Sequence, residues 1–376
     1  MNRSVVLHIV ERLEGLLSRL PAAIQKPVRQ ELTPLKELFL QQRAPRFMLA
    51  GSDRLPLPEI VNVLFSGEPA NDPQHTLFEV FRWQTLEVKN RGTISVLDAR
   101  GSDEQASYTV REELRRQPAD VIFIISDGSE SRTNVNRNAD NGRECVAWND
   151  ELHRDAGIIA IHLRPPISHN GQEDAHWSQR IQSQLHGRVW GGFEFWDARE
   201  KAAIDRAVAE ELAARLTAKL PNECREEMAR ISRNREAQRE VANRLIKSAS
   251  AICAAIGAQP IPLADLPILT ALQLAMVSGI MYISGRERSL RAATEFIGAL
   301  GVNVGAGMLL RESVRAMLKF FPGWGNVVCG MVAGAGTYAI GHAASAYFLE
   351  GVTLQEARRA YLQKRKRKKA DQLQLP

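Results

Sequence analysis

The chain has 376 residues, of which 44% are hydrophobic and 24% are charged, so it is long enough for two globular domains and its composition is not low-complexity. Its net charge of +6 comes from the single run 364–369, because the remaining Lys and Arg equal Asp and Glu in number. A basic face of the kind that binds nucleic acid is therefore not spread over the fold, and nucleic acid is not the expected partner.

The N-terminal region, residues 1–43, predicts two amphipathic helices. Val5, Ile9 and Leu13 recur at helical spacing, and a second apolar stripe begins near Leu32. These helices lead into a region of different character.

Residues 44–199 alternate short apolar runs with helical stretches, which is the pattern of an α/β sheet. The turn Asn90-Arg91-Gly92 favours a hairpin and hence one antiparallel strand. Strands are predicted at 46–50, at 121–126, at 157–163, at 188–195 and on both sides of the turn within 83–98, and a helix is predicted over 59–65. The expected fold is a doubly wound, mostly parallel sheet with one antiparallel strand.

Residues 200–247 form a long charged stretch with helical patterning. Pro221 marks a break within it. We interpret this stretch as a helical connector to the domain that follows.

Residues 248–350 are rich in glycine and apolar side chains and predict an all-α domain. Three stretches, 266–285, 296–310 and 320–349, carry no Asp, Glu, Lys or Arg. The first is long enough to cross a bilayer, but prolines crowd its start, and the second is too short. A membrane-spanning segment and the core of a helical bundle both remain open, and we expect membrane association in some form.

The last region, residues 351–376, is a basic tail. Thr353 and Glu356 have the spacing of a capping box that opens a final helix. A charge run is commonly a solvated end, but one that follows an apolar domain favours contact with anionic lipid on the cytoplasmic side of a membrane. The predicted membrane or partner contacts are Lys364, Arg365, Lys366, Arg367, Lys368 and Lys369.

A strand, then Gly51, then a helix is the place where a phosphate-binding loop would lie. On the template G-x-x-x-x-G-K-[ST] from Gly51, Pro56 replaces the second glycine, Leu57 the lysine and Pro58 the hydroxyl residue. Proline has no N–H for a phosphate oxygen, leucine has no charge, and Pro58 cannot ligate magnesium. Charge-assisted hydrogen bonds contribute about 1.5–3 kcal/mol each, so nucleotide binding should weaken by about three or more orders of magnitude.

The stretch 41–68 nevertheless resembles bacterial GTPases of the Era and dynamin-like superfamily. The matches to the family pattern of loop and helix, with at most a single-residue offset, are Gly51, Asn62, Leu64, Phe65 and Glu68. The resemblance implies a P-loop-NTPase-like G domain that has lost phosphate-binding residues.

Two other signatures of that family were compared with the chain. Asp98-Ala99-Arg100-Gly101 resembles D-x-x-G, in which the Asp supports magnesium and the Gly meets the γ-phosphate. The base-reading [NT]KxD signature would fall on 162–165, where neither its Lys nor its Asp is present. Gly51, Asp98 and Gly101 are thus predicted to be a vestigial cofactor-binding set, and a strand-end Asp beside a turn Gly is the simpler alternative.

The C-terminal half resembles a helical domain of unknown function that is attached to such bacterial GTPases. The resemblance rests on IPLADLPILTALQLAMV (261–277), GRERSL (285–290), FFPGWGNVV (320–328) and GTYAIGHAASAYF (336–348). The resemblance implies association with a membrane.

Histidines and cysteines do not predict a metal site or a nucleophile. His153, His162, His169, His176 and His186 lack the spacing of a ligand pair, and no serine nucleophile elbow or HExxH motif accompanies them. The four cysteines form no Cys-x-x-Cys pair, which fits a reducing cytoplasm.

Three hypotheses follow. The first is a pseudo-GTPase that serves as an interaction scaffold without enzymatic activity or cofactor, bound to a membrane surface and to a protein that is a related GTPase or a second copy. The second is a GTP-binding protein or GTP hydrolase that holds GTP and Mg²⁺ with Asp98, Arg54 and Arg100. The third is a nucleic-acid binder that acts through the tail.

Overall fold

The computed structural model divides the chain into two compact units. An α/β unit comprises Arg43–Asn234, and a helical unit comprises Met1–Gln42 with Arg235–Pro376. The structure describes residues 25–26, 29–33, 42–53, 55–65, 81–88, 91–102, 104–126, 132–152, 156–164, 189–196, 202–258, 266–300 and 324–373. Most of the predicted N-terminal helices lie outside these ranges. Residues 301–310 of the second apolar stretch and 320–323 of the third also lie outside them.

The α/β unit is built on a six-stranded sheet with strand order β2-β3-β1-β4-β5-β6. All pairings are parallel except β2 with β3, which pair antiparallel as the turn at Asn90-Arg91-Gly92 predicts. The strands are β1 (Arg46–Gly51), β2 (Trp83–Val88), β3 (Gly92–Asp98), β4 (Val121–Ser126), β5 (Gly157–Arg164) and β6 (Val189–Trp196). The predicted fold class is confirmed, and the predicted strands lie within one residue of those observed.

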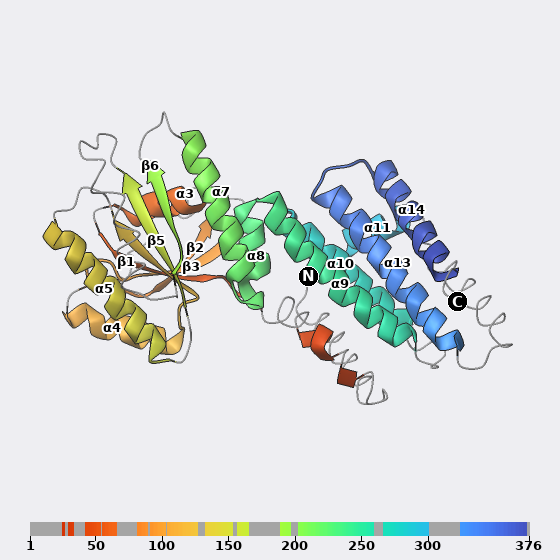
Figure 1. Cartoon of the computed structure of the whole chain (residues 1–376), viewed down its shortest axis with the longest axis horizontal. Helices are drawn as coiled ribbons and strands as arrows, with labels where there is room; N and C mark the ends of the chain where they lie inside the picture. Colours follow the sequence, from red (N-terminus) through yellow and green to blue (C-terminus); the bar gives the residue numbers. More distant parts are fainter. Residues whose placement is uncertain are drawn as a thin grey trace. The chain divides into compact units, whose positions relative to one another are not determined.

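Helices cover both faces of the sheet (Figure 1). One face is covered by α3 and α7, with α8 beside β3, and the other by α4 and α5. These helices are α3 (Leu57–Phe65), α4 (Glu104–Arg116), α5 (Arg132–Asp150), α7 (Ala202–Lys219) and α8 (Asn222–Ser232). Both faces of the central strands are therefore buried, which explains why β4 consists of the six apolar or small residues VIFIIS.

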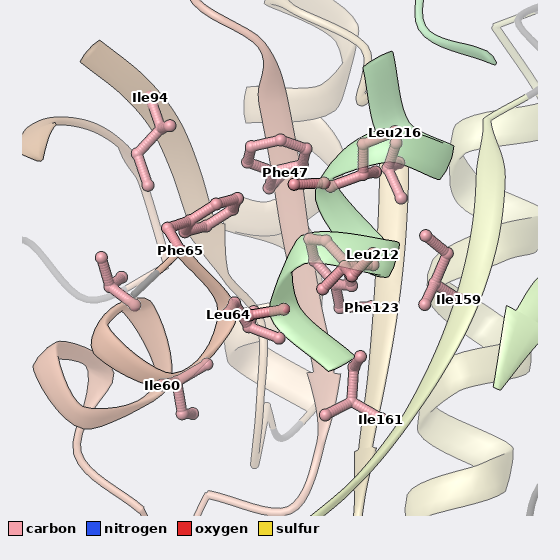
Figure 2. Close-up of a cluster of buried hydrophobic side chains, with 14 of the residues drawn as sticks. Phe47, Ile60, Leu64, Phe65, Ile94, Phe123, Ile159, Ile161, Leu212 and Leu216 are labelled. Atoms are coloured by element: carbon pink, nitrogen blue, oxygen red, sulfur yellow. The ribbon is translucent and has the colours of Figure 1, made fainter. Parts of the chain in front are cut away.

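The core on the α3 and α7 face is shown in Figure 2. Phe47 of β1 packs against Phe65 of α3 and Phe123 of β4, with ring centroids 5.2 and 5.3 Å apart. Leu212 and Leu216 of α7 are fully buried in the same cluster. The hydrophobic contacts of these aromatic and leucine side chains fix both helices on the sheet.

The segment 200–247, expected as a connector, is divided between the units. The helices α7 and α8 belong to the α/β core, and α9 (Arg235–Gly257) belongs to the helical unit. In α7 the charged side chains Glu210 and Glu211 are exposed, while Leu212 and Leu216 are buried. In α8, by contrast, the charged residues Arg225, Glu226 and Glu227 are themselves buried. Pro221 does mark the break, because it precedes the first residue of α8.

The helical unit is held together by helices that approach closely. The helices α9 and α13 pack against each other, and Gly330 and Gly334 of α13 face Ala254 of α9. A Cβ atom added at Gly330 would lie 2.5 Å from the Ala254 carbonyl oxygen, so only glycine permits this approach. The helices of this unit are α9, α10 (Leu266–Ile283), α11 (Leu290–Ala299), α13 (Trp324–Phe348) and α14 (Leu354–Leu373).

Polar and aromatic contacts add specificity to this unit. Gln273 of α10 donates a 2.9 Å hydrogen bond to Thr337 of α13, and Gln238 of α9 donates one of 2.8 Å to the carbonyl oxygen of Ile283. The Arg286 guanidinium lies 4.9 Å from the ring centroid of Phe348. The loop after α10 is thereby attached to the end of α13.

Among the described residues, none of the helices combines the length and apolarity that crossing a bilayer requires.

Candidate functional site

The candidate site is the loop that follows β1 at the carboxyl edge of the sheet, where α/β folds bind ligands. Gly51 ends β1 with φ of +98°, and a Cβ atom there would lie 2.3 Å from the Ile125 carbonyl oxygen. Glycine is therefore required by the close approach of β4 as well as by the backbone angle. The strand, glycine and helix predicted from the sequence are in place.

The N–H groups at the start of this loop bond to the protein itself. Gly51 N donates to the Asn141 side-chain oxygen at 3.1 Å, and Ser52 N donates to the Ile125 carbonyl oxygen at 2.9 Å. Further along, Glu59 N donates to the Pro56 carbonyl oxygen at 3.1 Å. In a phosphate-binding loop such N–H groups converge on the ligand, whereas these ones are used by β4, α5 and the first turn of α3.

The guanidinium of Arg100 lies inside the loop, and carbonyl oxygens of the loop point toward it. This guanidinium donates to the carbonyl oxygens of Leu55 at 2.7 Å and Ser52 at 3.3 Å. It also forms a two-bond ion pair with Asp98, through Nε at 2.8 Å and Nη2 at 2.7 Å. Arg100 is only 7% exposed. The interior of the loop is therefore lined by acceptors around an internal cation, the reverse of a site for phosphate oxygens.

The three predicted cofactor-binding residues come close to this internal cation. Asp98 ends β3, and both of its carboxylate oxygens bond to Arg100. Gly101 adopts φ of +64°, and a Cβ atom there would lie 2.5 Å from a carboxylate oxygen of Asp53. The structure thus brings the loop from Gly51 and the strand-end segment 98–101 together, joined through Arg100.

The charges around the loop do not favour a polyphosphate. Asp53 and Asp98 contribute two negative charges against the one positive charge of Arg100. Arg54, the other cation of the nucleotide-binding hypothesis, lies outside the described residues. The carboxylates of Asp53 and Asp98 would repel a bound triphosphate, while the charge of Arg100 is already paired with Asp98.

The end of β5, where the base-reading signature would lie, carries side chains other than the lysine and aspartate of that signature. His162 of β5 is 3% exposed and lies in register between Ser126 of β4 and Glu194 of β6. Leu163 next to it is buried as well. A lysine to stack on a base and an aspartate to hydrogen-bond it are both missing from these positions.

Sequence reasoning did not find the roles of Asn141 and Arg100. Asn141, which lies in α5, holds Gly51 N and also donates to Ser102 Oγ at 3.0 Å. Arg100 was considered as a phosphate ligand, whereas the structure places its guanidinium in bonds to Asp98 and two carbonyl oxygens. The only local signal for Arg100 is its spacing of two residues from Asp98, at which a side chain can reach back to a strand-end carboxylate.

Metal and thiol chemistry have no support among the described residues. No group of three or more His, Cys, Asp or Glu side chains there could hold a metal ion. Burial raises the pKa of the Cys253 thiol to about 12, and it raises the pKa of Cys145 and Cys224 further still. These thiols stay protonated and inert at neutral pH.

The basic run lies within helix α14. The predicted capping box is confirmed, since Thr353 N donates to Glu356 Oε2 at 2.9 Å and Glu356 N donates to Thr353 Oγ1 at 3.3 Å. The bonds that Thr353 donates to the Glu356 carboxylate, from its N–H and from its hydroxyl at 2.8 Å, lower the pKa of Glu356. The six basic residues of 364–369 therefore continue a helix whose start is fixed by its cap.

Comparison with protein families finds a match in the C-terminal part of the chain. Residues 222–374 match a family described as a domain of unknown function (DUF697), a C-terminal domain family that accompanies GTPases. The match contains all four segments on which the resemblance of the C-terminal half rests, and that part of the prediction is confirmed. The match starts at α8, a helix that packs on the sheet of the α/β unit. A comparison with curated proteins finds no match to this chain.

Proposed function

We propose that this chain is a pseudo-GTPase: a G-domain-like α/β unit that acts as an interaction module and is held at a membrane surface by its C-terminal region. A sheet of this kind next to a GTPase-associated helical domain supports a place among GTPase-associated proteins. The resemblance of the loop region to Era and dynamin-like GTPases makes that superfamily the proposed origin of the α/β unit.

Arg100 is the observation that carries the proposal. Its guanidinium already satisfies the loop carbonyls of Ser52 and Leu55 and both oxygens of Asp98. A nucleotide with magnesium would have to displace this cation, turn two carbonyl oxygens away and break the ion pair with Asp98, whose side chain is 24% exposed. Each charge-assisted hydrogen bond that is lost costs about 1.5–3 kcal/mol, which adds to the phosphate contacts that Pro56, Leu57 and Pro58 cannot make.

Nucleotide binding by the full chain tests this directly. Fluorescent GTP with magnesium, titrated in parallel into this protein and into an intact GTPase, should bind the intact GTPase with micromolar affinity and this protein only non-saturably. The unfolding midpoint of this protein should likewise not move with millimolar GTP, because a ligand at about 100 times its Kd would stabilise the fold by about 2.7 kcal/mol. Saturable micromolar binding would refute the pseudo-GTPase and favour the GTP-binding alternative.

The membrane part of the proposal rests on the position of the basic run. Lys364 to Lys369 follow an apolar helical unit in the same chain and lie within α14. Each basic residue near an anionic surface adds about 1 kcal/mol of attraction. The proposed location is therefore the cytoplasmic side of a membrane, where anionic lipids face the protein.

Flotation with liposomes that contain anionic lipid tests the membrane role. The full chain should float, and a chain with residues 364–369 changed to Gln should stay at the bottom of the gradient, while liposomes of neutral lipid should bind neither. A full chain that does not float would contradict the proposal. Salt-sensitive binding to random DNA of comparable strength would favour the nucleic-acid alternative.

The protein partner is proposed to be an intact GTPase of the same kind or a second copy of the chain. A G-domain-like surface that no longer opens for a nucleotide can still present the shape that a related domain recognises, although this argument is an analogy from the fold. Light scattering of the purified chain should report a dimer if the partner is a second copy. A strictly monomeric chain at micromolar concentration would leave the related GTPase as the proposed partner.

A further inference from the structure

A hollow lies at the amino edge of the sheet, opposite the edge that carries the loop from Gly51. Its volume is about 220 Å³, and it lies among the end of α3, the turn between β2 and β3, the helix α7 and the end of α8. Three arginines line it, Arg91, Arg206 and Arg233, and we name it the arginine hollow. Its apolar wall includes Leu64 and Phe65, which Figure 2 shows at the end of α3. No function described above uses this region.

The backbone around the hollow is fixed by a tight contact between the hairpin turn and α8. Thr93 N donates to the Glu227 side chain at 2.8 Å, and Glu227 lies so close to Gly92 that a Cβ atom there would meet its oxygen at 2.4 Å. Arg91 N donates to the Val88 carbonyl oxygen at 2.8 Å within the turn. The position of Arg91 beside α8 is therefore determined by the fold.

Arg233 is placed as firmly as Arg91. It ends α8 in the left-handed conformation, with φ of +49°, and its N–H donates to the Arg230 carbonyl oxygen. This conformation closes a helix and is unusual for a side chain other than Gly or Asn. The helix end thus presents an arginine to the hollow where glycine would be the ordinary choice.

Basic side chains outnumber acidic ones among the described residues that line the hollow. These residues include three arginines and one carboxylate, that of Glu210, and Arg233 makes a further interaction within the fold. Arg91 donates to the Phe65 carbonyl oxygen at 2.8 Å, but neither Arg91 nor Arg206 forms an ion pair with any residue that the structure describes. Burial lowers the pKa of Arg91, and the neighbouring charge of Arg233 lowers it further. An anion in the hollow would favour the charged form of Arg91 and so act against both effects.

We propose that the arginine hollow binds the phosphate group of a small organic molecule. Because the described lining residues carry more positive than negative groups, the hollow favours a phosphate monoester, which carries about −1.5 to −2 at pH 7, over a single carboxylate. The planar guanidinium groups can each donate two parallel hydrogen bonds to phosphate oxygens. The apolar wall at Leu64, Phe65 and Ala213 suits a short carbon skeleton attached to the phosphate.

Calorimetric titration of the full chain with glycerol 3-phosphate in a low-chloride buffer tests this site. We expect saturable binding with one ligand per chain. Arg206→Gln should raise the Kd about tenfold, because one charge-assisted contact is lost, while Arg206 is exposed and its replacement leaves the fold intact. The matched control is Arg115→Gln, an exposed arginine of α4 outside the hollow, which should leave the Kd within about twofold.

The phosphate could also belong to a lipid head group, and a second arm separates the two sources. Vesicles that contain phosphatidic acid offer the same phosphate at a surface. If the protein binds these vesicles through Arg206 but does not bind glycerol 3-phosphate, the site belongs to a lipid head group. Equal losses in Arg206→Gln and Arg115→Gln would overturn the proposal, as would non-saturable binding of both probes up to about 10 mM.

Discussion

At the carboxyl edge of the sheet, Arg100 lies among two carbonyl oxygens and a carboxylate, whereas at the amino edge Arg91 lies beside another arginine, Arg233. Both side chains are partly or fully withdrawn from water. Arg100 donates to both carboxylate oxygens of Asp98 and to two backbone carbonyl oxygens. Arg91 donates to one backbone carbonyl oxygen, that of Phe65.

The contrast separates two uses of the same side chain. An arginine surrounded by the acceptors of its own protein is part of the structure, and it closes the site to anions. An arginine that shares its surroundings with another positive charge is held at a cost in free energy, which a bound anion can offset. The edge that resembles a nucleotide site is therefore the one that we propose to be closed.

The largest expected effect tests the closed edge. Replacing Arg100 by Met, which has similar length and no charge, leaves Asp98 and the carbonyl oxygens of Ser52 and Leu55 without their donor. We expect the free energy of unfolding to fall by about 3–5 kcal/mol, because the hydrogen bonds of a buried guanidinium to two carbonyl oxygens and to the partly exposed carboxylate of Asp98 are lost. Urea unfolding followed by the fluorescence of Trp83 and Trp190 in the same unit measures this loss.

The control for Arg100→Met is Arg115→Met on α4. Arg115 is exposed and pairs with Glu112 at the surface, so its replacement should change the free energy of unfolding by less than about 1 kcal/mol. If the free energy of unfolding fell by less than about 1 kcal/mol in both variants, Arg100 would not be a structural cation, and the contrast between the two edges would fail.

The second prediction concerns the turn that directs the loop carbonyls toward Arg100. Gly51→Ala puts a Cβ atom 2.3 Å from the Ile125 carbonyl oxygen and requires φ of +98° from a residue that disfavours it. We expect a loss of about 2–3 kcal/mol in the free energy of unfolding. Gly336→Ala is the control, because nothing lies within 4 Å of its Cβ position in α13, and it should instead stabilise the helical unit by about 0.5–1 kcal/mol.

The third prediction tests the open edge through ligand linkage. Glycerol 3-phosphate at about ten times its Kd should raise the free energy of unfolding of the α/β unit by about 1.4 kcal/mol. The increase should be largely lost in Arg206→Gln and retained in Arg115→Gln. An increase of the same size in all three proteins would point to a general salt effect and not to the arginine hollow.

The two edges also differ in how far the sequence could predict them. The strand, Gly51 and the following helix are local patterns, and so are the strand-end Asp98 and the turn at Gly101, and all were located correctly. The bonds of Arg100 to the carbonyl oxygens of Ser52 and Leu55 join segments 45 residues or more apart in the chain, and no local pattern signals them.

The amino edge could not be predicted from the sequence because its helices were assigned to a connector. In α7, exposed charges such as Glu211 and half-buried Arg215 alternate with buried leucines such as Leu212 and Leu216, so the average composition hides the apolar face. Without α7 and α8 on the sheet, Arg91, which lies in a hairpin turn, has no reason to meet Arg233. The family match at 222–374 places α8 in the C-terminal domain, and the packing of α8 on β3 shows that this boundary crosses the α/β core.

The smallest expected effect compares Arg91 with Arg100 directly. Arg91→Gln removes a half-buried cation whose burial and whose neighbour Arg233 both disfavour its charge, and it removes one hydrogen bond to the Phe65 carbonyl oxygen. The relief of repulsion and the lost bond act in opposite directions, so the free energy of unfolding without phosphate should change by less than about 1 kcal/mol. Urea unfolding at low and high salt measures the change, and high salt should reduce the relief because it screens the repulsion. A loss as large as that of Arg100→Met would mean that Arg91 is a structural cation too, and the arginine hollow would then have no charge to spare for a ligand.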